Sequence, residues 1–148
     1  MKNQPLIVER TLNAPVSIIW KAFTDKEEMK KWYFDVDAFK PEIGFVFHFN
    51  GTSKENVTYR HECKITEIII NKKIAFTWRY EGYEGNSLVT IELFAAGKMT
   101  TLRLTHEDLE TFPASNKDFA KENFNEGWNH IIGVSLPKYL EELLASSY

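Results

Sequence analysis

Hydrophobic and polar residues alternate along five segments between residues 44 and 106, with the period of two that is typical of β-strands. In residues 44–50, Phe45, Phe47 and Phe49 fall on one face of the predicted strand. The same pattern predicts strands over residues 56–68, 74–80, 87–94 and 99–106, and a shorter β-like run covers residues 6–12. Short connections join most of these segments, so we expect the strands to pair in an antiparallel sheet.

Apolar residues at spacings of three and four predict helices in three places. Asn13 can cap the first helix, with Pro15 in its first turn, and a second short helix follows within residues 24–34. The third and longest covers residues 122–144, where the apolar side chains form one continuous stripe.

The longest predicted helix contains two residues that disfavour a regular helix, Gly133 and Pro137. Pro137 has no amide hydrogen to donate to the carbonyl of Gly133, and its ring crowds that carbonyl. We therefore expect a kink between these two residues, or a helix that is re-formed after a short break. Such a bend either gives a cavity a mouth or only follows the curvature of the sheet.

These elements predict an α+β fold in a single domain over residues 1–148. The alternation gives the sheet one apolar face, and the C-terminal helix is the only predicted element long enough to cover that face. Large rings on a concave sheet can leave a cavity between the sheet and the helix.

Composition narrows the classes of function. A net charge of −3 argues against a nucleic-acid partner, and no apolar run approaches the ~20 residues that span a bilayer. The N-terminal residues lack the apolar core of a signal peptide, and the lone Cys63 excludes an internal disulfide. We therefore expect a cytoplasmic protein. Aromatic residues make up 14% of the chain, which suggests a core or a cavity wall built from rings.

Four segments together resemble a known family: ERTLNAPVSIIWKAFTD, IAFTWRY, SLVTIELFAAGKMTTLRLTH and NEGWNHIIGVSLPKYLEELL. In this order they are similar to the heat-shock protein 90 ATPase activator (Aha) C-terminal-like domain family, over about residues 7–144. That family is part of the START/Bet v-like (SRPBCC) superfamily.

The resemblance implies a helix-grip fold, with a curved antiparallel sheet of about seven strands around a long C-terminal helix and two short helices after the first strand. It also implies an elongated apolar cavity between the sheet and the helix. Members of the superfamily bind lipids, sterols, polyketides or other hydrophobic molecules, and some are cyclases, aromatases or hydrolases. The family takes its name from a co-chaperone, so the resemblance also suggests a chaperone partner and a role in stress response.

Rings with a few polar tips are the residue types that line a pocket for an apolar ligand. We expect the cavity wall to include Trp32, Phe45, Phe47, Phe49, Tyr59, His61, Cys63, Phe76, Trp78, Tyr80, Leu104, His106, Phe124, Trp128 and Ile132. A well-packed aromatic core is the alternative. The four histidines show no metal-ligand spacing, so we expect neither a metal site nor a cofactor.

Two histidines, His61 and His106, fall on inward strand faces and are candidates for contacting a ligand or for acid–base chemistry. A buried histidine that is satisfied by its neighbours is the commoner arrangement. Cys63 shares the face of His61, but no third group is evident that would orient a Cys–His pair. We therefore assign no catalytic residue.

Three functions stay open. Binding of a small hydrophobic molecule without catalysis fits the rings best and is the function that we expect. A cyclase- or hydrolase-type enzyme would need His61 or His106 to face the cavity beside a second titratable group, such as Tyr59, Glu62 or Glu107. Strand alternation puts Glu62 on the polar face, which counts against it. A protein-interaction module would have a filled core and an exposed apolar patch instead. An edge strand of the antiparallel sheet can also pair with a second copy of the chain, so a homodimer is a further possibility.

Overall fold

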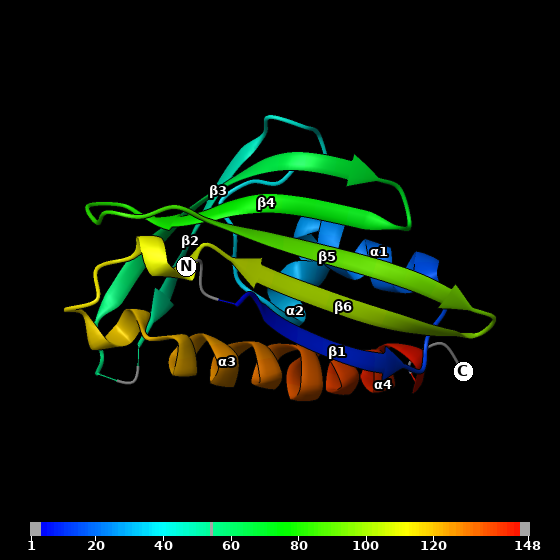
Figure 1. Cartoon of the computed structure of the whole chain (residues 1–148). Coiled ribbons are helices and arrows are strands. Elements are labelled where there is room, and N and C mark those ends of the chain that lie inside the picture. Colours follow the sequence, from blue (N-terminus) through cyan, green and yellow to red (C-terminus); the bar gives the residue numbers. More distant parts are fainter. Residues whose placement is uncertain (1–3, 54, 146–148) are drawn as a thin grey trace.

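The chain forms one curved sheet that lies over a long C-terminal helical segment (Figure 1). This computed structural model describes residues 4–53 and 55–145. The two ends of the expected domain, residues 1–3 and 146–148, lie outside the described residues, as does residue 54.

The sheet consists of β1 (Leu6–Leu12), β2 (Val46–Thr52), β3 (Thr58–Ile69), β4 (Lys73–Tyr80), β5 (Ser87–Ala96) and β6 (Met99–Glu107). These strands pair antiparallel in the order β1-β6-β5-β4-β3-β2. The helices are α1 (Val16–Thr24), α2 (Lys26–Trp32), α3 (Lys121–His130) and α4 (Leu136–Ala145), with 3₁₀ turns η1 (Leu109–Thr111) and η2 (Lys117–Phe119). None of the helices in the described part of the chain is long and apolar enough to cross a membrane.

The helix-grip class is confirmed, because α1 and α2 follow β1 and the C-terminal helical segment covers the sheet (Figure 1). The number of strands is corrected: the described residues form six, where the resemblance implies about seven. Each segment with β-like alternation forms one strand, and no such segment is left to form another. The connection between α2 and β2 carries Pro41 and Gly44 and contains no helix or strand.

Local sequence explains where the two short helices begin. Asp25 caps α2, because its side chain accepts hydrogen bonds from the amides of Glu27 and Glu28 at 2.9 and 3.3 Å. At the start of α1, Pro15 takes the N-cap position, so the helix begins two residues later than a cap by Asn13 would give.

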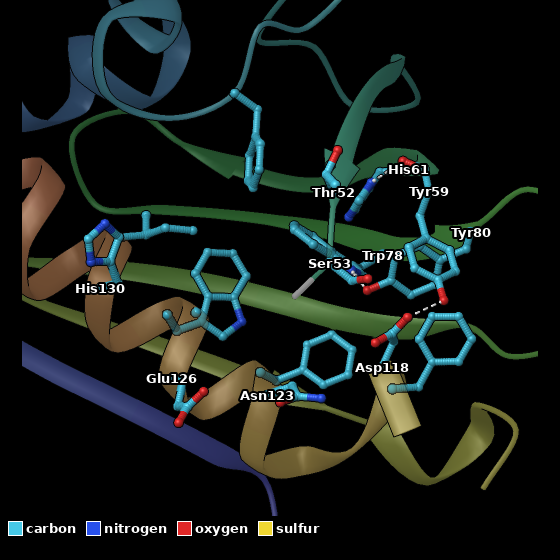
Figure 2. A pocket seen from close by; sticks show the side chains of 17 residues that line it. Thr52, Ser53, Tyr59, His61, Trp78, Tyr80, Asp118, Asn123, Glu126 and His130 are labelled. Atoms are coloured by element: carbon cyan, nitrogen blue, oxygen red, sulfur yellow. Dashed lines mark hydrogen bonds between the residues drawn. The ribbon is translucent and has the colours of Figure 1, made fainter. Parts of the chain in front are cut away.

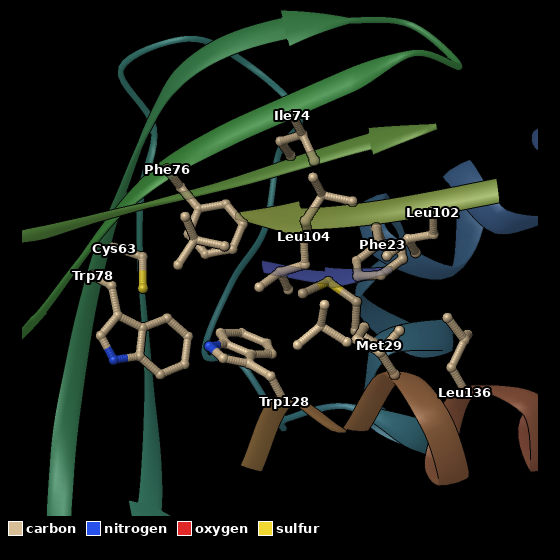
Figure 3. Packing of buried hydrophobic residues seen from close by; sticks show 14 of the residues in the cluster. Phe23, Met29, Cys63, Ile74, Phe76, Trp78, Leu102, Leu104, Trp128 and Leu136 are labelled. Carbon is tan, nitrogen blue, oxygen red and sulfur yellow. The ribbon is translucent and has the colours of Figure 1, made fainter. Parts of the chain in front are cut away.

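The two short helices fill one end of the concave face of the sheet. Phe23 of α1 and Met29 of α2 are buried there beside Leu102 of β6 and Leu136 of α4 (Figure 3). Because this packing occupies one end of the concave face, an open cavity can form only toward the other end, beneath α3.

The C-terminal helical segment changes its hydrogen-bond register where we expect a kink or a break. Between α3 and α4, residues Ile131–Ser135 (η3) form a π-helix, and the amide of Leu136 donates to the carbonyl of Ile131. This π segment ends just before Pro137, the residue that cannot donate. Gly133 also lets Arg10 of β1 approach, since a Cβ at position 133 would lie 3.4 Å from Nε of Arg10.

Candidate functional site

A cavity of about 530 Å³ lies between the concave face of the sheet and α3 (Figure 2). The strands contribute the end of β2 and inward side chains of β3 and β4, while η2 and α3 form the opposite wall. Its lining is Phe34, Gly51, Thr52, Ser53, Tyr59, His61, Trp78, Tyr80, Asp118, Phe119, Asn123, Phe124, Glu126, Gly127, Trp128, His130 and Ile131. Seven of these 17 residues are Phe, Tyr or Trp, and the polar side chains come mainly from the ends of β2, η2 and α3.

His61 lies within a cluster of rings on the sheet side of the cavity. Its ring stacks on Phe49 at 4.4 Å and meets the edges of Trp78 and Tyr80 at 4.9 and 4.7 Å. Nδ1 donates a hydrogen bond of 3.1 Å to the carbonyl of Tyr59. Burial lowers the pKa of His61 to about 4, so the ring is neutral near pH 7.

Gly51 makes the position of the His61 ring sterically accessible. A Cβ at position 51 would lie only 2.7 Å from Cε1 of His61, which is closer than nonbonded carbon atoms tolerate. The absence of a side chain at position 51 on β2 therefore fixes where the paired strand β3 can place its histidine.

Tyr59 joins the sheet to η2 at the polar side of the cavity. Its hydroxyl donates to Oδ2 of Asp118 at 2.6 Å (Figure 2) and accepts from Nδ2 of Asn116 at 3.2 Å. Burial, together with the Asp118 hydrogen bond, raises the pKa of Tyr59 above its usual value. The bond holds the connection after β6 against β3, and it leaves the Asp118 carboxylate at the cavity wall.

A chain of buried hydrogen bonds fixes the two tryptophans that line the cavity. Nε1 of Trp128 donates to Nδ1 of His106 at 3.0 Å, so Nε2 of His106 carries the proton and donates to Oγ of Ser87 at 2.7 Å. The Ser87 hydroxyl in turn donates to the carbonyl of Trp78 at 2.7 Å, and Nε1 of Trp78 donates to the hydroxyl of Tyr80 at 2.9 Å. Burial lowers the pKa of His106 to about 3. Both of its nitrogens are engaged, so His106 positions Trp128 rather than facing the cavity.

The family description "Activator of Hsp90 ATPase homolog 1-like protein" matches residues 13–141 of this chain. The chain belongs to this family. The match runs from the residues before α1 into α4, so it includes every element that lines the cavity. A search of the curated proteins finds no match.

Solved structures share the fold of this family member at low sequence identity. CV1439 from Chromobacterium violaceum aligns with a TM-score of 0.76 at 20% identity, covering 90% of this chain and 94% of that one. CalU16 from Micromonospora echinospora gives a TM-score of 0.71 at 20% identity, covering 96% and 79%. DynU16, a protein of the dynemicin biosynthetic locus, gives 0.75 at 19% identity, covering 94% of this chain and 48% of its own length. The chain thus spans about half of DynU16, and at these identities the likeness shows the fold.

The structure divides the residues that the sequence places on the cavity wall into two groups. Those that line the cavity are Tyr59, His61, Trp78, Tyr80, Phe124 and Trp128. Those that pack in the core behind the wall, or in the case of Phe45 against that core, are Trp32, Phe45, Phe47, Phe49, Cys63, Phe76, Leu104, His106 and Ile132. Strand alternation identifies the inner face correctly, but α1 and α2 fill one end of that face in this family member.

Sequence patterns miss several residues of the lining. Phe34 ends the segment predicted as the second short helix and Phe119 lies in η2, and neither belongs to a periodic apolar pattern. Asp118 precedes the predicted long helix, and Asn123 lies within it but off its apolar stripe. His130 is exposed at the outer end of the lining. A large ring outside any apolar stripe is the only signal in the sequence that points to Phe34 and Phe119.

The thiol of Cys63 is not poised as a nucleophile. Cys63 is fully buried, and burial raises the pKa of its thiol well above the usual value. Glu62 lies on the opposite face of β3, where it contacts His48 and Arg79 at 3.3 Å each. Within the described residues, no three His, Cys, Asp or Glu side chains lie together as a metal site would require.

Proposed function

We propose that this family member binds one small, flat, largely apolar molecule in the cavity and carries out no chemical step on it. The observation that carries the proposal is the cavity itself: about 530 Å³ of space walled by Phe34, Trp78, Trp128 and their neighbouring rings. Volumes of roughly 300–1,000 Å³ with apolar, aromatic lining are typical of pockets for small molecules. A protein-interaction module, in contrast, predicts a filled core at this place.

The rings favour an aromatic or polyketide-like ligand over an aliphatic lipid or a sterol. Aromatic side chains add edge-to-face and offset-stacked contacts with another ring, worth about 0.5–1.5 kcal/mol each beyond simple burial. The ring centroids of Trp78 and Trp128 lie 5.2 Å apart with 61° between their planes. A flat ligand can therefore make both stacked and edge-to-face contacts with these two rings. The origin of DynU16 in the dynemicin biosynthetic locus is in keeping with a small-molecule role.

The polar side chains of the lining suit a ligand with a few polar substituents. Asp118 and Asn123 lie on the η2–α3 side of the cavity, opposite the strands (Figure 2). A carboxylate and an amide there can bond to a hydroxyl group while the rings contact the apolar body.

A cyclase-type activity through His61 is the second candidate, because this histidine is neutral and lines the cavity. A general base works best with a pKa near the working pH, and a pKa of about 4 makes His61 a weak base. His106 has no free nitrogen, since Trp128 and Ser87 engage both. Binding without catalysis is therefore the function that the geometry supports best.

A cavity-filling variant tests the proposal. Gly127 of α3 lines the cavity, and a Cβ built there meets nothing within 4 Å, so Gly127→Leu can fill space without a clash. The wild type should bind the fluorescent probe 1-anilinonaphthalene-8-sulfonate (ANS), and Gly127→Leu should bind it at least tenfold more weakly. Glu122→Leu, on the exposed side of the same helix, is the control and should bind like the wild type. Equal ANS binding by all three proteins would refute a ligand site at this cavity.

A further inference from the structure

We propose that the hydroxyl of Tyr33 is a recognition point for the ligand, donating a hydrogen bond to a neutral carbonyl oxygen at the inner end of the bound molecule. This inference rests on the proposed function, and it narrows the ligand class to flat aromatic ketones or quinones. Tyr33 directly follows α2 and lies outside the cavity lining described above.

The Tyr33 hydroxyl is buried, and among the described residues it has no hydrogen-bond partner. Buried polar atoms are nearly always bonded, because leaving one unpaired costs free energy that folding must offset. The other buried or half-buried tyrosine hydroxyls are engaged: Tyr59 bonds to Asp118, Tyr80 to Trp78 and Tyr139 to Glu28. An unpaired donor in this position is therefore unusual, and a partner brought by a ligand accounts for it.

The Tyr33 ring lies one layer behind the inner wall of the cavity. It meets the ring of Phe34 at 4.6 Å and lies nearly parallel to Trp128, with centroids 6.4 Å apart and 18° between the planes. Phe34 and Trp128 both line the cavity. A ligand that passes the Phe34 ring would consequently come against Tyr33.

Phe34 is the part of the inner wall that can move most easily. Trp78 and Trp128 are each held by an indole hydrogen bond, whereas Phe34 is held by ring packing, including a stack on Phe49 at 4.2 Å. Phe34 also belongs to the connection between α2 and β2, which contains no helix or strand. Segments with few backbone hydrogen bonds open at low cost, so a small shift of this connection would extend the cavity to Tyr33.

The surroundings of the hydroxyl select the chemistry of the acceptor. Burial, and to a lesser degree the nearby Cys63, raises the pKa of Tyr33 well above its usual value, so the hydroxyl keeps its proton and can donate. The Tyr33 ring packs against the rings of Phe34, Phe49 and Trp128, and apolar rings do not compensate a buried charge. A neutral carbonyl oxygen therefore fits, and a carboxylate does not.

The test compares two ligands that differ only in a carbonyl group, 9-fluorenone and fluorene, by their displacement of ANS. In Tyr33→Phe, affinity for fluorenone should fall by roughly three- to tenfold while affinity for fluorene stays within twofold. Tyr83→Phe is the matched control, because Tyr83 packs on Tyr59 outside the cavity and should leave both affinities unchanged.

Each outcome of this comparison decides one question. If both compounds bind the wild type and Tyr33→Phe weakens neither, or weakens both alike, the assignment of Tyr33 is wrong and the ligand-binding function stands. If neither compound displaces ANS from the wild type, the proposed aromatic ligand class fails and the inference fails with it.

Thermal stability provides an independent readout of the same hydroxyl. Removal of an unpaired buried hydroxyl should raise the Tm of ligand-free Tyr33→Phe by about 2–4 °C, while the same variant loses fluorenone affinity. A lower Tm would mean that the hydroxyl is already bonded in the free protein, which contradicts the proposal. Phe34→Ala opens the path to Tyr33, so it should raise the preference for fluorenone over fluorene, and the added substitution Tyr33→Phe should abolish that gain.

Discussion

The indole nitrogen of Trp128 donates a hydrogen bond to Nδ1 of His106 at 3.0 Å, and this contact ties α3 to β6 at the base of the cavity. His106 is fully buried, and its Nε2 donates onward to Ser87. The cavity wall is thus held by a polar chain inside an apolar core. Because a half-satisfied buried network costs more than an apolar one, the chain also fixes where α3 can lie on the sheet.

Replacing His106 by leucine should destabilise the protein without emptying much core volume. His106→Leu leaves the buried indole N–H of Trp128 without an acceptor, so the free energy of unfolding should fall by about 1–3 kcal/mol. Urea unfolding followed by circular dichroism measures this change. His48→Leu on the opposite sheet face, where the ring meets Glu62 at 3.3 Å and is partly exposed, should change stability by less than about 1 kcal/mol. Equal losses of unfolding free energy in the two variants would contradict the structural role of the hydrogen-bond chain through His106.

Stability should decline as the pH falls through the weakly acidic range. Burial lowers the pKa of His106 to about 3 and that of His61 to about 4, so both rings are neutral in the folded protein down to those values. In the unfolded chain they protonate near pH 6.5, so only the unfolded state gains protons below that pH. The two neutral rings contribute fully to the free energy of unfolding above about pH 6.5. This contribution is lost progressively as the pH falls toward 4 for His61 and 3 for His106, by up to about 1.4 kcal/mol per pH unit for each histidine.

Urea unfolding at pH 5.0 to 7.0 measures this dependence. His106→Leu should show roughly half of the wild-type loss between pH 6.5 and pH 5, because one of the two buried histidines is gone. His130→Gln, at an exposed position, should keep the full loss. A wild-type stability that does not change over this range would show that the two rings are not held neutral by the fold.

Substitution by alanine should have opposite effects on stability at two glycines, Gly51 and Gly127. At Gly51 the new Cβ would lie 2.7 Å from the ring of His61, so Gly51→Ala should cost about 1–3 kcal/mol and weaken ANS binding as the ring is displaced. At Gly127 the Cβ meets open space within a helix, so Gly127→Ala should stabilise the protein by about 0.5–1 kcal/mol. Thermal unfolding of both variants is the measurement. A stable Gly51→Ala with unchanged ANS binding would mean that His61 has another position available.

The sequence is a good guide to the strands, because alternation depends only on which side of the sheet faces the core. It places Tyr59, His61, Trp78 and Tyr80 on the inner face, and all four line the cavity. It cannot distinguish them from Phe47, which shares that face but lies in the packed core. That distinction depends on how far α1 and α2 reach under the sheet, which no spacing of residues encodes.

The features that the sequence does not predict lie outside the alternation of its strands and the apolar stripes of its helices. Phe34 reaches the cavity from the connection between α2 and β2, and Asp118 reaches it from η2. Their placement follows from tertiary contacts such as the bond between Tyr59 and Asp118. The pair Gly133 and Pro137 does signal an irregular helix, but not its form. The π-helix at residues 131–135 resets the hydrogen bonds and brings Gly133 against Arg10, a partner 123 residues away in sequence.

Native mass spectrometry of the protein after gentle purification, followed by denaturing extraction, tests ligand binding most directly. We predict that an apolar aromatic compound copurifies with the wild type at up to one molecule per chain and that the mass of Gly127→Leu shows none. A wild-type mass without any bound compound, together with no binding of ANS, fluorene or fluorenone, would refute ligand binding in the cavity and would favour a protein-interaction role for this fold.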